Sequence, residues 1–196
     1  MDHSSFIAEA WSQLARALSK TAAKAGLNHY PTLMSRCARG RCMRELRRLA
    51  VLIRRLIFLM ALTLELAPAA PREGRNYFRA EEAKPRRCKP YFRITPVPAG
   101  ALPELCRSVT VASRSGKVDA IPVLVRWMGL LDVVTHRERR AKCLARTIQR
   151  WQAKGEPKPH VAPTAHTHRF SAQLGLIAMA LPMLLNTALQ AWPDTG

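Results

Sequence analysis

The apolar residues near the N-terminus recur at steps of three and four positions, as on one face of an α-helix: Ile7, Trp11, Leu14, Leu18 and Ala22. We therefore expect an amphipathic helix over 5–25, with Ser5 capping its start and Gly26 ending it. Pro31 lacks the backbone N–H that a helix needs and restricts the residue before it, so the next helix must begin after this point.

The second predicted helix starts between Thr32 and Arg41 and runs to about Ala67, where the segment APAAP stops it. In its first half, basic and apolar residues fall on opposite sides at 100° per residue. The basic side holds Arg44, Arg47, Arg48, Arg54 and Arg55. The apolar side holds Leu46, Leu49, Ile53, Leu56 and Ile57. Over 56–64 only Thr63 is polar, and because this run is too short to span a bilayer, it must be buried in protein or in a membrane interface.

The middle of the chain, 67–118, contains seven of the prolines and clusters of charged residues. Prolines at this density prevent a long helix, so we expect a Pro-rich basic linker that is partly disordered. Two pieces of it could order locally, the aromatic-bearing KPYFRITP and the β-branched RSVTVAS, and either could add a strand or lie across a pair of helices.

Helical patterning resumes at Asp119, which can cap a helix with Pro122 in its first turn. Thr135 and Glu138 have the spacing of a capping box, so a further helix is expected from there to Lys154, and Gly155 follows as its stop. Together these form a helical hairpin over 119–155. One face of its second helix is basic: Arg139, Lys142, Arg146, Arg150 and Lys154.

A second linker is expected over 156–169, followed by an uncharged hydrophobic helix over 170–192. The length of this helix fits a membrane span, although Pro182 weakens that interpretation. Its apolar stripe would serve equally well as the side of a helix that faces a protein core: Leu174, Ile177, Leu181, Leu184 and Leu185.

The chain of 196 residues carries 32 Lys and Arg against 13 Asp and Glu, a formal net charge of +19. Such an excess repels itself in a compact monomer and favours an anionic partner. Arg suits bidentate phosphate contacts, but the abundance of Arg, Ala, Leu and Pro also fits a coding sequence rich in G and C, which weakens the inference.

The five cysteines are odd in number and no secretory signal precedes them, so we expect reduced, cytosolic thiols. Cys37, Cys42 and Cys88 with one of the linker histidines could supply four zinc ligands, but their spacing is loose and arginines flank them. No paired carboxylates and no complete phosphate loop are present, since SRSGK lacks the upstream glycine. We therefore expect a non-enzymatic protein without metal, cofactor or small-molecule substrate.

The fold class expected is mainly α, with helical blocks over 5–66 and 119–192 joined by the Pro-rich basic linker. The favoured function is an adaptor at anionic surfaces, in the cytoplasm and peripheral to or anchored in the inner membrane. In this interpretation Arg44, Arg47, Arg48, Arg54 and Arg55 attract the lipid. The anchor residues would be Leu56, Ile57, Phe58, Leu59 and the stripe of the last helix.

Two alternatives stay open. The first is nucleic-acid binding without sequence specificity, through Arg139, Lys142, Arg146, Arg150 and Lys154. The second is a partly disordered chain with no dedicated ligand, and hydrophobic helices could also take a protein partner.

The segments MRELRRLAVLIRRLIFLMA, PYFRITP and RRAKCLARTIQRWQAKGEPKP resemble a loose group of Arg-, Leu- and Pro-rich bacterial proteins of unknown function. The resemblance covers about 42–160 and is mostly compositional. It implies a bacterial setting and transfers no functional residues.

Overall fold

The structure is a computed structural model that describes residues 3–65 and 116–192. It is mainly α, as the sequence predicts, with five α-helices and two short strands in the described ranges. The helices are α1 (His3–Ala25), α2 (Arg36–Thr63), α3 (Ile121–Thr135), α4 (Arg137–Ala153) and α5 (Ala172–Ala188). The strands are β1 (Leu33–Ser35) and β2 (Lys117–Asp119). The predicted linker over 67–118 lies almost entirely outside the described residues.

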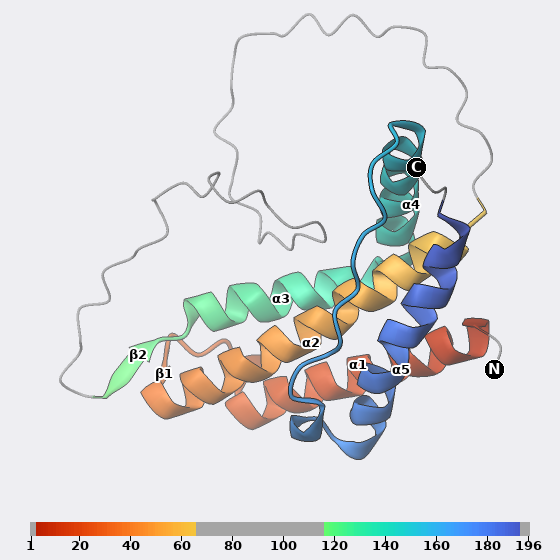
Figure 1. Cartoon of the computed structure of the whole chain (residues 1–196). Helices are drawn as coiled ribbons and strands as arrows, with labels where there is room; N and C mark the ends of the chain where they lie inside the picture. The colour runs from red at the N-terminus through yellow and green to blue at the C-terminus, as the bar shows by residue number, and fades with distance from the viewer. Residues whose placement is uncertain (1–2, 66–115, 193–196) are drawn as a thin grey trace, which may run out of the picture.

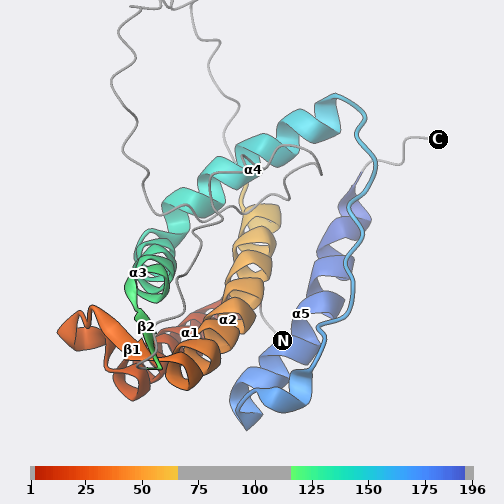
Figure 2. The same ribbon diagram turned by 90° about the vertical axis from the view of Figure 1, so that its left-hand side faces the viewer.

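Helix α2 is the centre of the fold, and all four other helices pack against it. Figure 1 shows α1 antiparallel to α2, α3 alongside α2, and α5 crossing the α1–α2 pair. Figure 2 shows α4 turning away from the direction of α3 and passing over the C-terminal end of α2. The two predicted helical blocks therefore share one hydrophobic core. Its largest fully buried side chains include Leu14, Leu18, Leu46, Leu49, Leu52, Ile53, Leu56, Ile57, Leu59, Leu130 and Leu181.

A two-stranded antiparallel sheet, absent from the predictions, joins the starts of α2 and α3. Met34 is opposite Val118 in its register. The last residue of each strand also caps a helix: the Ser35 hydroxyl accepts a hydrogen bond of 3.2 Å from the Ala38 N–H, and a carboxylate oxygen of Asp119 accepts one of 2.8 Å from the Ile121 N–H. The segments KPYFRITP and RSVTVAS lie outside the described residues.

The predicted helix ends are partly right. Gly26 follows the last residue of α1 with φ 65°, a left-handed conformation that glycine adopts at low cost. Ser5 is not the cap, because α1 already includes His3. Helix α2 ends at Thr63 rather than Ala67, since Leu64 turns to an extended conformation.

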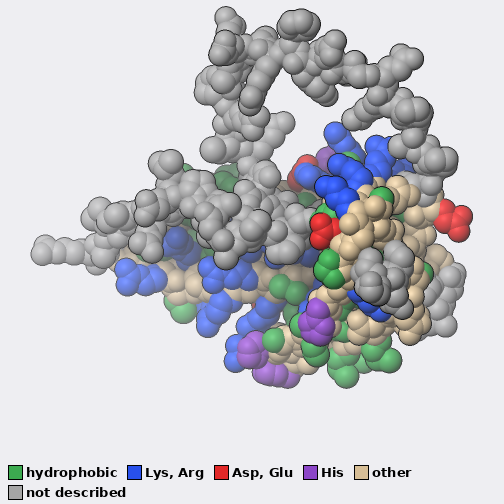
Figure 3. Space-filling view, turned by 45° about the horizontal axis from the view of Figure 1, so that its top comes forward, with side chains coloured by type: hydrophobic (Ala, Val, Ile, Leu, Met, Phe, Trp, Pro, Cys, Tyr) green, Lys and Arg blue, Asp and Glu red, His purple; other side chains and the backbone are tan. Residues whose placement is uncertain are grey.

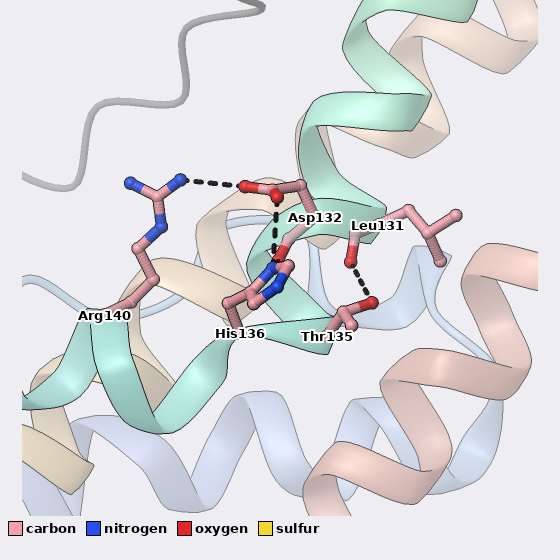
Figure 4. A network of polar contacts seen from close by, with 5 residues as sticks. All are labelled: Leu131, Asp132, Thr135, His136 and Arg140. Carbon is pink, nitrogen blue, oxygen red and sulfur yellow. Dashed lines mark hydrogen bonds and ion pairs between the residues drawn. The ribbon is translucent and has the colours of Figure 1, made fainter.

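The junction between α3 and α4 differs from the predicted capping box. The Thr135 hydroxyl donates to the Leu131 carbonyl oxygen at 2.9 Å, so it belongs to α3 and does not cap α4. Asp132 organises the turn instead (Figure 4). Its carboxylate accepts a hydrogen bond of 2.8 Å from the Arg140 guanidinium, and its other oxygen lies 3.1 Å from His136 Nδ1. The prediction was wrong because Thr135 can bond backward within its own helix as readily as forward.

After α4, the chain turns at Gly155, which has φ 68°, and runs across the molecule to the start of α5 (Figure 1). The indole N–H of Trp192 donates a hydrogen bond of 3.1 Å to the Glu156 carbonyl oxygen. This bond connects the last of the described residues to the start of the segment that follows α4. Pro182 is accommodated inside α5.

Candidate functional site: a basic groove beside an apolar ridge

Helix α5 is apolar on both of its faces. The stripe predicted from the sequence faces inward: Leu174, Ile177, Leu181 and Leu185 are buried, and Leu184 is half-buried. The outward face carries Leu176, Met179 and Met183, whose side chains are 69%, 63% and 72% exposed. We call these three residues the apolar ridge. Their spacing of three and four places them in one line along the helix.

The stretch Ala172–Ala191 is 20 residues long and contains an 18-residue window with a mean hydropathy of 1.6, one third of which is buried. It is the one helix in the described ranges that is long and apolar enough to cross a membrane. Core helices of soluble proteins share these properties, so the exposure of the ridge, not the hydropathy, distinguishes α5 from an ordinary buried helix.

A groove of about 1320 Å³ lies between α1, the first half of α2 and the start of α5. Seven cationic side chains and a single carboxylate, Glu45, line it. The cations are Arg16, Lys20, Lys24, Arg41, Arg44, Arg48 and Arg169. We call this the basic groove. Such a concentration of one charge sign in a concave surface attracts anions more strongly than isolated surface charges do.

Few of these cations are neutralised by the protein. Arg48 pairs with Glu45 at 3.3 Å, and Arg16 lies 3.8 Å from Glu9 in a solvent-exposed pair. Solvent-exposed ion pairs of this kind contribute little to the stability of the fold. In the described part of the chain, the other five groove cations form no ion pair. The groove therefore retains most of its positive charge.

Cys42 lines the groove as a buried thiol. Burial raises its pKa above the ordinary value, and the neighbouring charge of Glu45 raises it further. A raised pKa leaves less of the thiolate, which is the nucleophilic form of the side chain.

The five arginines predicted to form one lipid-facing surface are divided among three places. Arg44 and Arg48 line the groove. Arg47 and Arg54 lie close to Arg126 of α3, whose pKa is lowered by burial and then by these two charges. Arg55 donates hydrogen bonds to the segment before α5, to the Thr164 hydroxyl and to the Ala162 carbonyl oxygen. The five arginines therefore have different surroundings, because α3 and the 156–169 segment pack against different parts of α2, and their role at a lipid surface stays a prediction.

The anchor predicted on α2 is also corrected. Leu56, Ile57 and Leu59 have no exposed surface, and Phe58 is half-buried against the same core. In this fold these side chains pack in the core that α2 shares with the other helices.

The predicted basic face of α4 is exposed as expected: Arg139, Lys142, Arg146, Arg150 and Lys154 all face solvent. On the opposite side, Ala141, Leu144, Ala145 and Ile148 are buried. Figure 1 places α4 near the end of α2 that is far from β1, whereas the groove uses the beginning of α2. Figure 3 shows Lys and Arg side chains gathered in separate areas of one face, with few acidic side chains among them.

No metal site is found among the described residues, where no three His, Cys, Asp or Glu side chains are grouped. Of the predicted zinc ligands, Cys37 is exposed, Cys42 is buried, and Cys88 lies outside the described residues.

The ridge and most of the groove were not predicted from the sequence. The stripe on the inner face of α5 implied that Leu176, Met179 and Met183 would face outward, and their apolar character was visible in the sequence. The spacing of Arg16, Lys20 and Lys24 at steps of four would likewise have indicated a basic row on α1. Nothing in the sequence places Arg169 beside that row.

Comparisons with protein-family models, with curated proteins and with solved structures find no match to this chain.

Proposed function

We propose that this protein binds peripherally to the anionic cytoplasmic surface of a membrane, with the apolar ridge as its hydrophobic contact and the basic groove as its phosphate contact. The observation that carries the proposal is their adjacency. Both features use the start of α5: its residues up to Leu174 line the groove, and Leu176, two residues further on, begins the ridge on the outward face of the same helix.

The depths of the two features suit a bilayer surface. An interfacial helix buries its apolar face by about 5–10 Å, into the boundary between headgroups and acyl chains. Helix α5 lies on the α1–α2 pair, and a helix with its side chains is about 10–12 Å across. Cations behind the ridge would therefore lie at the level of the lipid phosphates.

Both contributions to binding are of useful size. Each cation near an anionic surface is worth about 1 kcal/mol, and each methylene buried in the acyl region about 0.8 kcal/mol. The ridge alone offers three large side chains that are exposed in the free protein. Unlike the exposed apolar residues of α3, the ridge belongs to the helix whose start lines the basic groove, and this combination favours an anionic lipid surface as its partner.

The test is vesicle binding by the full-length protein, comparing neutral phosphatidylcholine vesicles with vesicles that also contain phosphatidylglycerol. The ridge variant L176Q/M179Q/M183Q is expected to lose binding to the anionic vesicles. Its matched control is I121Q/V125Q/M128Q, which makes three similar changes at exposed apolar positions of α3. The control should bind like the wild type. Loss of binding in the control but not in the ridge variant, or equal wild-type binding to neutral vesicles, would refute the proposal.

Fractionation of cells distinguishes a peripheral protein from an inserted one. We expect high salt to weaken membrane association and alkaline carbonate to release the protein. Retention through carbonate would instead mean that α5 leaves the core and crosses the bilayer.

A second candidate function is nucleic-acid binding without sequence specificity, and the exposed basic face of α4 favours it. From Arg139 to Lys154 this face extends for about 22 Å at 1.5 Å per residue, long enough to follow several phosphates. The variant R139Q/R146Q/R150Q should then lose affinity for a DNA duplex in a gel-shift assay and keep its affinity for anionic vesicles. Unchanged DNA binding would exclude this second function.

A further inference from the structure

We propose that the basic groove is a receptor for a phospholipid headgroup with two phosphates, as in cardiolipin, rather than a diffuse patch of positive charge. The inference rests on the proposed function, because it assigns a specific lipid to the same site.

The concave shape of the site is the first argument. A groove of about 1320 Å³ is large enough to admit a whole headgroup, since ligand pockets commonly enclose about 300–1,000 Å³. In integral membrane proteins, basic pockets between transmembrane helices on the cytoplasmic side hold such headgroups, which shows that clustered cations suit this chemistry.

The arrangement of the cations is the second argument. Arg16, Lys20 and Lys24 form a row on α1 that extends for about 12 Å, and Arg41, Arg44 and Arg48 form one on α2 that extends for about 10 Å. Helices α1 and α2 run antiparallel (Figure 1), and both rows belong to the lining of the groove. Two phosphates joined by a glycerol bridge fit within this length, so each can meet cations from both helices. A single phosphate uses only part of the rows.

The end of the groove at α5 suits the rest of a lipid. Phe170 and Leu174 line it there with apolar side chains, and the ridge begins two residues after Leu174, on the outward face of α5. Arg169 and the positive N-terminal end of the α5 dipole lie at the same place. A headgroup in the groove would thus have its glycerol and first methylenes beside Phe170 and its acyl chains beside the ridge.

The same features distinguish a lipid from a nucleic acid. Strands of nucleic acid are held by several aromatic side chains on which bases stack, whereas Phe170 is the one aromatic side chain in this lining. An apolar ridge has no role beside a nucleic-acid groove.

The experiment compares two sets of vesicles with equal total negative charge. One set contains phosphatidylglycerol, which carries one phosphate, and the other contains half as much cardiolipin, which carries two. We expect wild-type protein to bind the cardiolipin vesicles about tenfold more tightly.

Two double variants separate the groove from general charge. K20Q/R44Q removes one exposed cation from each row and should abolish the preference for cardiolipin. R139Q/R146Q removes the same charge from α4 and should preserve it. Circular dichroism establishes that both variants are folded.

The outcomes are distinct. Equal binding of wild-type protein to both charge-matched vesicles would overturn this inference and leave the proposed function standing. Absence of binding to either set would overturn both. A preference that R139Q/R146Q removes and K20Q/R44Q retains would overturn the assignment to the groove. Displacement of bound cardiolipin by a single-stranded oligonucleotide that K20Q/R44Q no longer binds would reassign the groove to nucleic acid.

Discussion

The Arg55 guanidinium donates a hydrogen bond of 2.7 Å to the carbonyl oxygen of Ala162, and so connects α2 to the segment that leads into α5. It also donates to the Thr164 hydroxyl, which in turn donates 2.9 Å to the Ala178 carbonyl oxygen of α5. An arginine predicted to attract lipid thus helps to hold the helix that carries the ridge.

Replacing Arg55 with Met should destabilise the fold, because Met keeps much of the side-chain volume and removes every donor. We expect the free energy of unfolding to fall by about 1.5–3 kcal/mol, the usual contribution of a hydrogen bond to a charged group. Urea denaturation measures the change. The control is Arg139→Met at an exposed position, where the effect should stay within about 0.5 kcal/mol. Equal effects at the two sites would show that the contacts of Arg55 contribute nothing.

Leu56 and Leu176 should respond in opposite ways to replacement by Ala. Leu56 is fully buried, so Leu56→Ala should cost about 2–5 kcal/mol of stability through the cavity it leaves. Leu176 is 69% exposed, so Leu176→Ala should cost less than about 0.5 kcal/mol and weaken vesicle binding. Urea denaturation and vesicle sedimentation give the two readouts. A stable Leu56→Ala variant with impaired vesicle binding would restore the anchoring role predicted for Leu56.

Asp132 should stabilise the α3–α4 junction at neutral pH and lose this effect in acid. The hydrogen bond from Arg140 lowers its pKa below the ordinary value of 3.8; the charges of Arg140 and His136 also lower it, while burial opposes them. Because the folded state favours the carboxylate, the stabilisation is complete above the ordinary pKa and disappears as the pH falls through the lower, folded-state value.

Comparing wild type with Asp132→Asn tests this expectation. Asp132 is half exposed, so the difference at neutral pH should be at most about 1 kcal/mol. Thermal unfolding across the acid range should show the two proteins converging below pH 3.8. A difference that stays constant through that range would contradict the role of the carboxylate charge.

The cysteines should differ in their reaction with iodoacetamide, which requires the thiolate. Cys42 is buried with a raised pKa, whereas Cys37 and Cys143 are exposed. In a C88S/C106S background, mass spectrometry should find Cys37 and Cys143 modified at least about tenfold faster than Cys42. In denaturant the three rates should become similar. Rapid modification of Cys42 in the folded protein would show that iodoacetamide reaches this thiol through the basic groove.

The sequence by itself determined where most of the helices lie and which of their residues share a face. Helical periodicity depends on residues three and four apart, so it can be read without knowing the fold. This is why the basic face of α4 and the inner stripe of α5 were predicted correctly. The stop at Gly26 is local in the same way, because it depends on the conformational freedom of one residue.

Only the tertiary structure decided which apolar surfaces are covered. The end of α2 and the whole of α5 are both apolar on more than one side, so periodicity could not say which of them remains exposed. Four helices surround α2, and α5 is left at the edge with its ridge uncovered. The groove likewise depends on long-range packing, since it combines Arg16, Arg44 and Arg169, which only the crossing of α5 over the α1–α2 pair brings to one place.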